Sequence, residues 1–333
     1  MQDNEKLPSA NEHVQIKPEL EQVAQKIEQI KNEIAKVIVG QDEVLELLIA
    51  GLLTGGHILL EGVPGIAKTL TAKLLARSVS VDFSRIQFTP DLMPTDVTGT
   101  TVFNLKTSEF TFNRGPVFSN IVLIDEINRA PAKTQAALFE VMEELQITID
   151  GTSHILTEPF MVIATQNPVE QEGTYKLPEA QLDRFLFRIK MGYPSYAEEV
   201  SILQRFKEGA SKDHEVNIQS VISAAEFSAC KKAIHLVHVK DELIEYIAQI
   251  VQATRTSADL YLGASPRASL AIMRAAKTIA VINSRDFVIP EDIQRVTYPV
   301  LNHRIILTPE REMEGIASEE VIREIIQSIE VPR

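Results

Sequence analysis

Residues 57–69 read His-Ile-Leu-Leu-Glu-Gly-Val-Pro-Gly-Ile-Ala-Lys-Thr, and this stretch decides the fold. The apolar run from Ile58 to Leu60 predicts a buried parallel strand, and the glycines after it let the backbone turn tightly around an anion. A helix that begins at Lys68 directs its first N–H groups at the same anion. Lys68 can then reach the outer phosphates of a nucleotide, and the Thr69 hydroxyl can bind Mg²⁺. The stretch therefore predicts an α/β fold with a phosphate-binding loop, against the alternative of a plain Gly/Pro turn.

One position of this loop departs from the usual P-loop pattern. Ala67 stands where a glycine usually precedes the lysine. Alanine keeps its backbone N–H donor, and we expect it to fit with a negative φ, because its Cβ disfavours the left-handed region. The loop is therefore expected to bind phosphate despite the substitution.

Two further apolar runs end in polar residues that suit phosphate chemistry. Residues 121–124 predict a central strand that ends in Asp125 and Glu126, and residues 160–165 predict a third strand that leads to Asn167. Asp125 would hold Mg²⁺, usually through water, and Glu126 would polarise the attacking water as the general base. Asn167 could hydrogen-bond that water or the γ-phosphate. Each residue alone reads equally well as a strand cap, but three in this order indicate nucleotide hydrolysis.

These segments together resemble the AAA+ ATPases, and the MoxR family among them. The resemblance runs from about residue 20 to the end of the chain and is carried by residues 39–41, 62–69, 114–118, 124–130, 164–168, 177–185 and 263–268. It implies a P-loop AAA+ core with a parallel sheet and two hairpin insertions, followed by a smaller all-α lid domain. It also implies ATP and Mg²⁺ as cofactors.

In this resemblance the helix break at residues 39–41 lies against the adenine, although on its own it is only a helix C-cap. The residues expected to contact the nucleotide are Val39, Gly40, Gly62, Val63, Pro64, Gly65, Ile66, Ala67, Lys68, Thr69, Leu70 and Asp125. Thr69 and Asp125 are also the expected metal ligands.

Arg267 is the first of two arginines with a predicted role. Ser265, Pro266 and Arg267 read as the N-cap and the first two positions of a helix. A cation in the first helical turn opposes the helix dipole, so we expect Arg267 to meet an anion. That anion could be a γ-phosphate, which Arg267 would reach when the lid closes. The resemblance names this position sensor 2. The alternative is an ion pair with a neighbouring carboxylate.

Arg184 is expected on a helix with Asp183 and with the apolar residues up to Leu186. The resemblance implies that it is an arginine finger, which reaches the nucleotide of a neighbouring subunit. Asp183 or Glu179 could instead hold it within its own chain. Three other arginines are rival fingers, namely Arg188, Arg129 and Arg114.

Two hairpins are predicted inside the α/β part. Residues 100–105 and 109–114 form the first, which the resemblance places as an insertion in the second helix of the core, facing the pore of a ring; a surface hairpin without a role is the alternative. Residues 146–149 and 152–155 form the second, because Asp-Gly between alternating strands favours a type I′ turn.

The chain is expected to divide into three parts. Residues 1–19 are polar and read as a flexible N-terminal tail. Residues 20–193 form the α/β nucleotide-binding domain, and residues 194–333 form the helical lid. The hinge between the two domains is expected at residues 193–195.

Composition limits the partners that this protein can have. The formal net charge of −13 argues against a nucleic-acid backbone as the main partner, since phosphate contacts need clustered Lys and Arg. The single cysteine excludes an intramolecular disulfide and fits a cytoplasmic location. The longest apolar stretch is too short to span a membrane, and no signal segment precedes the core.

The expected function is ATP hydrolysis at the subunit interfaces of a homo-oligomeric ring, most simply a hexamer. By family analogy the ring acts as a chaperone-like remodeller of a client protein, often with a von Willebrand A-domain partner. One rival is a nucleic-acid motor of the MCM-like branch. The other is a nucleotide-dependent scaffold with little turnover, against which the intact pair Asp125 and Glu126 argues.

Overall fold

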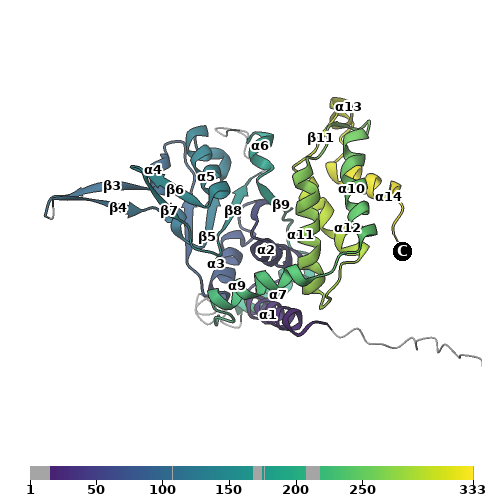
Figure 1. Ribbon diagram of the computed structural model, residues 1–333, viewed down its shortest axis with the longest axis horizontal. Helices are drawn as coiled ribbons and strands as arrows, with labels where there is room; N and C mark the ends of the chain where they lie inside the picture. Colours follow the sequence, from purple (N-terminus) through teal and green to yellow (C-terminus); the bar gives the residue numbers. More distant parts are fainter. Residues whose placement is uncertain (1–15, 107, 168–174, 176, 208–217, 333) are drawn as a thin grey trace, which may run out of the picture.

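The structure is a computed structural model that describes residues 16–106, 108–167, 175, 177–207 and 218–332. A parallel sheet with helices on both faces lies beside a bundle of helices from the C-terminal third of the chain (Figure 1). No helix in the described part of the chain is long and apolar enough to cross a membrane. Most of the expected tail, residues 1–15, lies outside the described residues.

The central sheet has five strands, all parallel, in the order β2-β5-β8-β1-β9. Their bounds are β1 His57–Glu61, β2 Phe83–Gln87, β5 Ile121–Asp125, β8 Met161–Gln166 and β9 Phe185–Lys190. The strands run in one direction, so their carboxyl ends share one edge of the sheet and their amino ends share the other. We call these the carboxyl edge and the amino edge.

Successive side chains of each strand enter different layers of the core. Ile58 and Leu60 belong to one buried cluster, whereas Leu59 belongs to the other. The first layer holds α1 Pro18–Ala35, α2 Asp42–Thr54 and α3 Lys68–Ser78, and the second holds α4 Pro94–Thr98 and α5 Ala132–Glu144. Burial on both faces explains why the three inner strands β1, β5 and β8 read as continuous apolar runs in the sequence.

Helix α1 presents one apolar face to the core. Its inward face consists of buried residues three and four positions apart, namely Leu20, Val23, Ile27, Ile30 and Ile34.

Both predicted hairpins are present and project from the same end of the core (Figure 1). The first pairs β3 Gly99–Asn104 with β4 Glu109–Arg114, and the second pairs β6 Gln146–Ile149 with β7 Thr152–Ile155. Asp150 and Gly151 have φ values of 49° and 78°, as a type I′ turn requires. The Thr101 hydroxyl donates to the Asp150 carboxylate at 2.6 Å, so the turn of the second hairpin supports the first.

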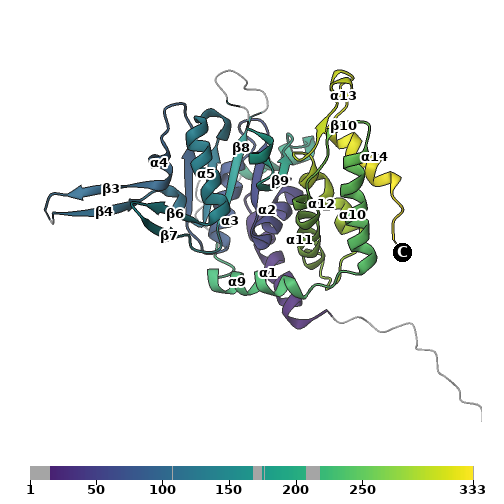
Figure 2. The ribbon, with the colours of Figure 1, turned by 45° about the horizontal axis from the view of Figure 1, so that its top comes forward.

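The C-terminal bundle consists of α10 Asp241–Thr256, α11 Pro266–Ile282, α12 Pro290–Leu301, α13 Pro309–Met313 and α14 Ser318–Ser328. It is helical but not wholly so, because β10 Leu260–Leu262 pairs with β11 Ile306–Leu307. Runs of two and three residues are too short for their periodicity to be recognised in the sequence. Figure 2 shows α11 between the sheet and the rest of the bundle, where it packs against α2 and α12.

Two helices that follow the sheet lie beside α1 rather than within this bundle (Figure 1). They are α7 Tyr196–Lys207 and α9 Ala224–Ala233. The Arg205 guanidinium of α7 donates to the Ala35 carbonyl at 2.9 Å. The domain boundary at residues 193–194 therefore stays a prediction.

The remaining elements are one short α-helix and three short 3-10 helices, which are labelled η. They are α6 Glu179–Leu182, η1 Pro116–Phe118, η2 Ile127–Arg129 and η3 Ile234–Leu236.

Candidate active site

The phosphate loop joins the carboxyl end of β1 to α3, as the sequence predicts. Strand β1 ends at Glu61 and α3 begins at Lys68. The Lys68 ammonium group donates to the Gly62 carbonyl at 2.6 Å. Burial lowers the pKa of Lys68, while the nearby charges of Asp125 and Glu126 act to raise it. Lys68 and the acidic pair therefore lie together at the carboxyl edge of the sheet.

Ala67 corrects the expected backbone of the loop. Its φ is +61° and its ψ is 19°, which is the left-handed region, so the expectation of a negative φ is wrong. The loop reverses direction over few residues before α3, and Gly65 also has a positive φ of 88°. For a residue with a Cβ the left-handed conformation costs about 1 kcal/mol, which glycine would avoid.

Gln41 holds the loop in place, a role that sequence reasoning missed, because only its position beside Val39 and Gly40 pointed to it. Its side-chain amide donates to the Ile66 carbonyl at 2.8 Å, and its oxygen accepts from the Thr71 hydroxyl at 3.1 Å. These bonds join the break before α2 to the phosphate loop. The expected adenine-side residues and the expected phosphate-side residues are therefore adjacent.

The acidic pair lies at the carboxyl end of β5 as predicted, and Thr165 of β8 connects its two members. The Thr165 hydroxyl accepts from the Glu126 backbone N–H at 3.1 Å and donates to the Asp125 carboxylate at 3.3 Å. Asn167, which is buried, comes directly after β8. Because β8 lies between β5 and β1, Asn167 lies at the carboxyl edge between the acidic pair and the loop.

Side chains of β2, which the sequence did not reveal as a strand, contact both carboxylates. The Arg85 Nε donates to an Asp125 oxygen at 2.5 Å, and the Gln87 amide donates to a Glu126 oxygen at 2.8 Å. Arg129 approaches the same Glu126 oxygen at 3.1 Å. The strand order predicts these contacts once β2 is known to lie next to β5.

The donor set at this edge fits Mg²⁺. Asp125 supplies a carboxylate and Thr69 a hydroxyl, which are the oxygen ligands that Mg²⁺ takes together with water and phosphate. Among the residues that the structure describes, no group of three or more His, Cys, Asp and Glu side chains could hold a metal ion. Thr69 and Asp125 would hold the metal together with water and phosphate oxygens.

Arg184 lies at the opposite, amino edge. The expected helix is present as α6, but it ends at Leu182, and the expectation that it includes Arg184 and Phe185 is wrong, because β9 begins at Phe185. Phe185 pairs with His57, the first residue of β1. The three residues after Arg184 are all apolar, and so short an apolar run does not distinguish a buried strand from a helix; pairing with β1 decides the outcome.

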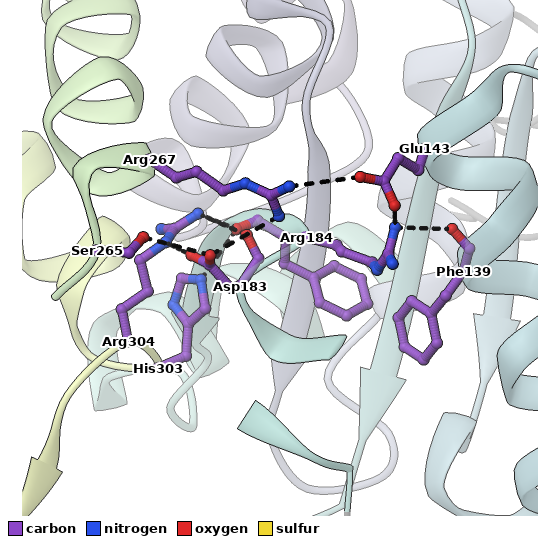
Figure 3. A network of polar contacts seen from close by, with 9 residues as sticks. Phe139, Glu143, Asp183, Arg184, Ser265, Arg267, His303 and Arg304 are labelled. Carbon is purple, nitrogen blue, oxygen red and sulfur yellow. Dashed lines mark hydrogen bonds and ion pairs between the residues drawn. The ribbon is translucent and has the colours of Figure 1, made fainter. Parts of the chain in front are cut away.

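Arg267 lies beside Arg184 (Figure 3). It occupies the second position of α11, after Ser265 as the N-cap residue, in agreement with the sequence. The Glu143 carboxylate receives Arg184 on one oxygen and Arg267, at 3.4 Å, on the other. Glu143 is thus the partner of Arg184, in place of the expected Asp183 or Glu179.

The position of Arg267 does not support closure of the lid on its own γ-phosphate. The five residues of β1 separate the amino edge from the phosphate loop, and at about 3.3 Å per residue this distance is roughly 17 Å. Arg184 and Arg267 therefore share an edge with each other and not with Lys68.

A buried arginine fixes this amino edge, and nothing in the sequence distinguished it. The Arg304 side chain is 4% exposed and donates to Asp183 at 2.7 Å and to the Phe185 carbonyl at 2.6 Å. Burial lowers the pKa of Arg304, and the bond to Asp183 acts to raise it. Neighbouring His303 bonds the same carbonyl through Nε2 at 2.9 Å. The bundle is thereby held to the start of β9.

The rival arginines lie elsewhere in the fold. Arg188 makes two bonds of 2.9 Å to Glu61 of the adjacent strand. Arg114 lies over the Phe118 ring, 5.1 Å from its centre. Arg129 is at the carboxyl edge with Glu126. The amino edge therefore presents Arg184 and Arg267 together.

Comparison with known proteins agrees with the fold. Residues 57–187 match the model of the ATPase family associated with various cellular activities (AAA), and residues 252–325 match the AAA lid domain. The chain is 49% identical over 300 residues to the Bacillus subtilis protein YeaC, described as uncharacterized, across 90% of this chain and 92% of that protein. It is 44% identical over 310 residues to chaperone MoxR1 of Mycobacterium tuberculosis, across 90% and 81% respectively.

A solved structure shows the same fold. A candidate ATPase from Cytophaga hutchinsonii superposes with a TM-score of 0.88 at 43% identity, over 95% of this chain and 97% of that chain. A phosphate loop after β1 and an acidic pair after β5, together with a helical lid, define an ATPase of the AAA+ class. Within that class, the chain belongs to the MoxR family.

Proposed function

We propose that this protein binds ATP with Mg²⁺ and hydrolyses it to ADP and phosphate at the boundary between two copies of the chain. The observation that carries the proposal is the separation of Lys68, Asp125 and Glu126 from Arg184 and Arg267 by the length of β1. A site that uses both groups needs a second chain, whose amino edge faces the carboxyl edge of the first.

The chain's own residues divide the work at such a site. Lys68 and the N–H groups at the start of α3 bind the phosphates, and Thr69 and Asp125 hold the metal. Glu126 accepts the proton of the attacking water, which Asn167 orients. Arg184 and Arg267 of the adjacent copy neutralise the charge that develops on the transferred phosphoryl group.

Contacts of this kind define a ring rather than a dimer with two equal faces. Two different edges meet in a head-to-tail manner, and such an interface repeats until the rotation closes. We infer a closed ring, and a hexamer is the size implied by the family. Every copy then contributes to two sites.

The client is a partner protein that the ring remodels, and a von Willebrand A-domain protein is the partner that family analogy suggests. MoxR1 of Mycobacterium tuberculosis is named a chaperone. The first hairpin supports this assignment, because Phe110 is 74% exposed and Leu105 85% exposed at its tip. Exposed apolar side chains on a projecting element are suited to contact a partner.

Mixing two inactive chains tests the shared site. Lys68→Ala removes the phosphate site, and Arg184→Ala removes the contribution to the neighbour. Each variant alone should be inactive, but in mixed assemblies an intact loop of one chain meets the intact arginine of the other, so part of the phosphate release should return. Phosphate release is measured after co-assembly has been verified by light scattering.

Two further mixtures make the result decisive. Lys68→Ala mixed with a chain that carries both substitutions should stay inactive, because neither chain has Lys68 to bind the phosphates. Lys68→Ala mixed with Arg267→Ala should regain activity if Arg267 acts on the neighbour and should stay silent if it acts on its own nucleotide. A silent first mixture, despite proven co-assembly, would refute a site shared between chains.

A further inference from the structure

Glu143 is the one carboxylate that contacts both Arg184 and Arg267 in the described part of the chain (Figure 3). Its two oxygens take one guanidinium each, as a bridging anion would. The side chain is 43% exposed, so it is not fixed by packing. Its place at this edge is therefore determined by the two cations.

Glu143 and Arg267 each lie at a helix end where the helix dipole is unfavourable for their charge. Glu143 is in the last turn of α5, where the helix dipole disfavours an anion, and that turn contains no basic residue. Arg267 is in the first turn of α11, where the dipole disfavours a cation, and that turn contains no acidic residue. Each charge offsets the cost of the other across a sequence separation of 124 residues.

The surroundings retain an excess of positive charge. A cavity of about 310 Å³ opens between α5, the start of β9 and α11, and its charged lining consists of Glu143, Asp183, Arg184, Arg267, Arg274 and Arg304. Four cations thus face two carboxylates on a chain whose net charge is −13. Asp183 bonds the buried Arg304 at 2.7 Å through one oxygen, and its other oxygen lies 3.9 Å from Arg267. Of the two carboxylates, Glu143 is the more exposed, and another anion could take its position between the arginines.

We propose that Glu143 is an internal competitor for phosphate, whose carboxylate holds the place that a phosphate group of the adjacent copy takes between Arg184 and Arg267. This inference rests on the proposed function, in which those arginines face a neighbouring nucleotide. A phosphate group has more oxygens and more negative charge than a carboxylate, so the two guanidinium groups favour the exchange. Glu143 then acts as a positioning residue, which keeps both arginines together before the neighbour arrives.

The test measures anion binding without hydrolysis. Inorganic tripolyphosphate is titrated into the Lys68→Ala chain by calorimetry at fixed ionic strength, so that the phosphate loop contributes little and screening is constant. Adding Glu143→Gln should tighten binding roughly three- to ten-fold, as expected for the loss of one or two exposed ion pairs. Glu144→Gln changes the net charge equally at the same helix end and should leave the affinity unchanged.

Further variants separate the possible outcomes. Adding Arg267→Ala to the Glu143→Gln chain should remove the gain, and Glu143→Asp should give an intermediate gain because its carboxylate is one carbon too short to hold both arginines. Equal affinities for Glu143→Gln and Glu144→Gln overturn the proposal. Because no turnover is measured, this result is independent of the mixing experiment, which tests the proposed function.

Discussion

Arg85 donates its Nε–H to a carboxylate oxygen of Asp125 at 2.5 Å, across the neighbouring strands β2 and β5. Asp125 is the carboxylate expected to hold Mg²⁺, so the Arg85 guanidinium and a metal ion would compete for this carboxylate. The Arg85 side chain is 55% exposed, and exposed ion pairs contribute little to stability, so the pair can open at small cost.

Replacing Arg85 should therefore lower the Mg²⁺ concentration that the protein needs. For Arg85→Gln we expect the Mg²⁺ midpoint of nucleotide binding to fall roughly two- to five-fold. A fluorescent ATP analogue titrated with Mg²⁺ measures this midpoint. Gln87→Ala is the matched control, since Gln87 lies on the same strand but contacts Glu126. A higher midpoint for Arg85→Gln would show that Arg85 helps to bind the metal.

The division of work at the carboxyl edge predicts two different defects. Lys68→Ala should abolish ATP binding, because the loop loses its phosphate cation. Glu126→Gln should bind ATP and lose ~10²–10⁴ in the rate of phosphate release, as is typical when a general base is removed. Equilibrium binding and steady-state phosphate release measure both effects. Glu140→Gln, an exposed carboxylate on α5, is the control, and turnover of Glu126→Gln at the parent rate would assign the base elsewhere.

The left-handed conformation of Ala67 predicts a stabilising substitution. Ala67→Gly removes a Cβ from a residue with a φ of +61° and should raise the free energy of unfolding by roughly 1 kcal/mol, with ATP affinity retained. Ala72→Gly, in the middle of α3, should lower it by about the same amount, because glycine weakens a helix interior. Urea denaturation gives both values. A less stable Ala67→Gly chain would contradict the positive φ.

His57 predicts a loss of stability in acid. Its Nδ1 accepts from the Val162 N–H at 3.0 Å and its Nε2 bonds the Met142 carbonyl at 3.0 Å, so the neutral ring satisfies both partners. Burial lowers the pKa of His57 from 6.5 to about 4. Between these values the unfolded chain binds more protons, so stability falls as the pH decreases through this window, by about 3 kcal/mol in total.

Urea midpoints measured from pH 7.5 to pH 4 test this dependence. His57→Gln should be less stable at neutral pH, where two buried bonds are disturbed, but its midpoint should change less with pH. Burial also lowers the pKa of His303, so part of the slope remains in this variant. The exposed His235→Gln should keep the parent slope. An unchanged slope in His57→Gln would assign the acid sensitivity to other groups.

The sequence predicted those parts of the molecule whose signals are local. The loop after β1, the acidic pair after β5 and the Asp-Gly turn of the second hairpin each depend on residues within a few positions of one another. Short apolar runs with turn signals around them suffice for such elements.

Apart from the positive φ of Ala67, which is a local feature of the loop, the errors arose where distant segments decide the outcome. Strand β9 was expected to be helical around Arg184, because only its pairing with β1 distinguishes the two structures. Arg267 was correctly placed at the start of a helix, but the sequence could not show that this helix starts at the amino edge. The bridging role of Glu143 depends on partners 41 and 124 positions away along the chain (184 − 143 and 267 − 143). The periodicity of a sequence carries no information about contacts between residues so far apart in the chain.

The placement of the two half-sites on opposite edges has a genetic consequence. In a head-to-tail ring, one copy that lacks both Lys68 and Arg184 disables its own site and that of its neighbour. If such copies mix freely with intact ones, the fraction of sites that remain active equals the square of the fraction of copies that are intact. A cell that carries one sound and one damaged allele would thus lose more activity than its gene dosage suggests, and the damaged allele would be dominant.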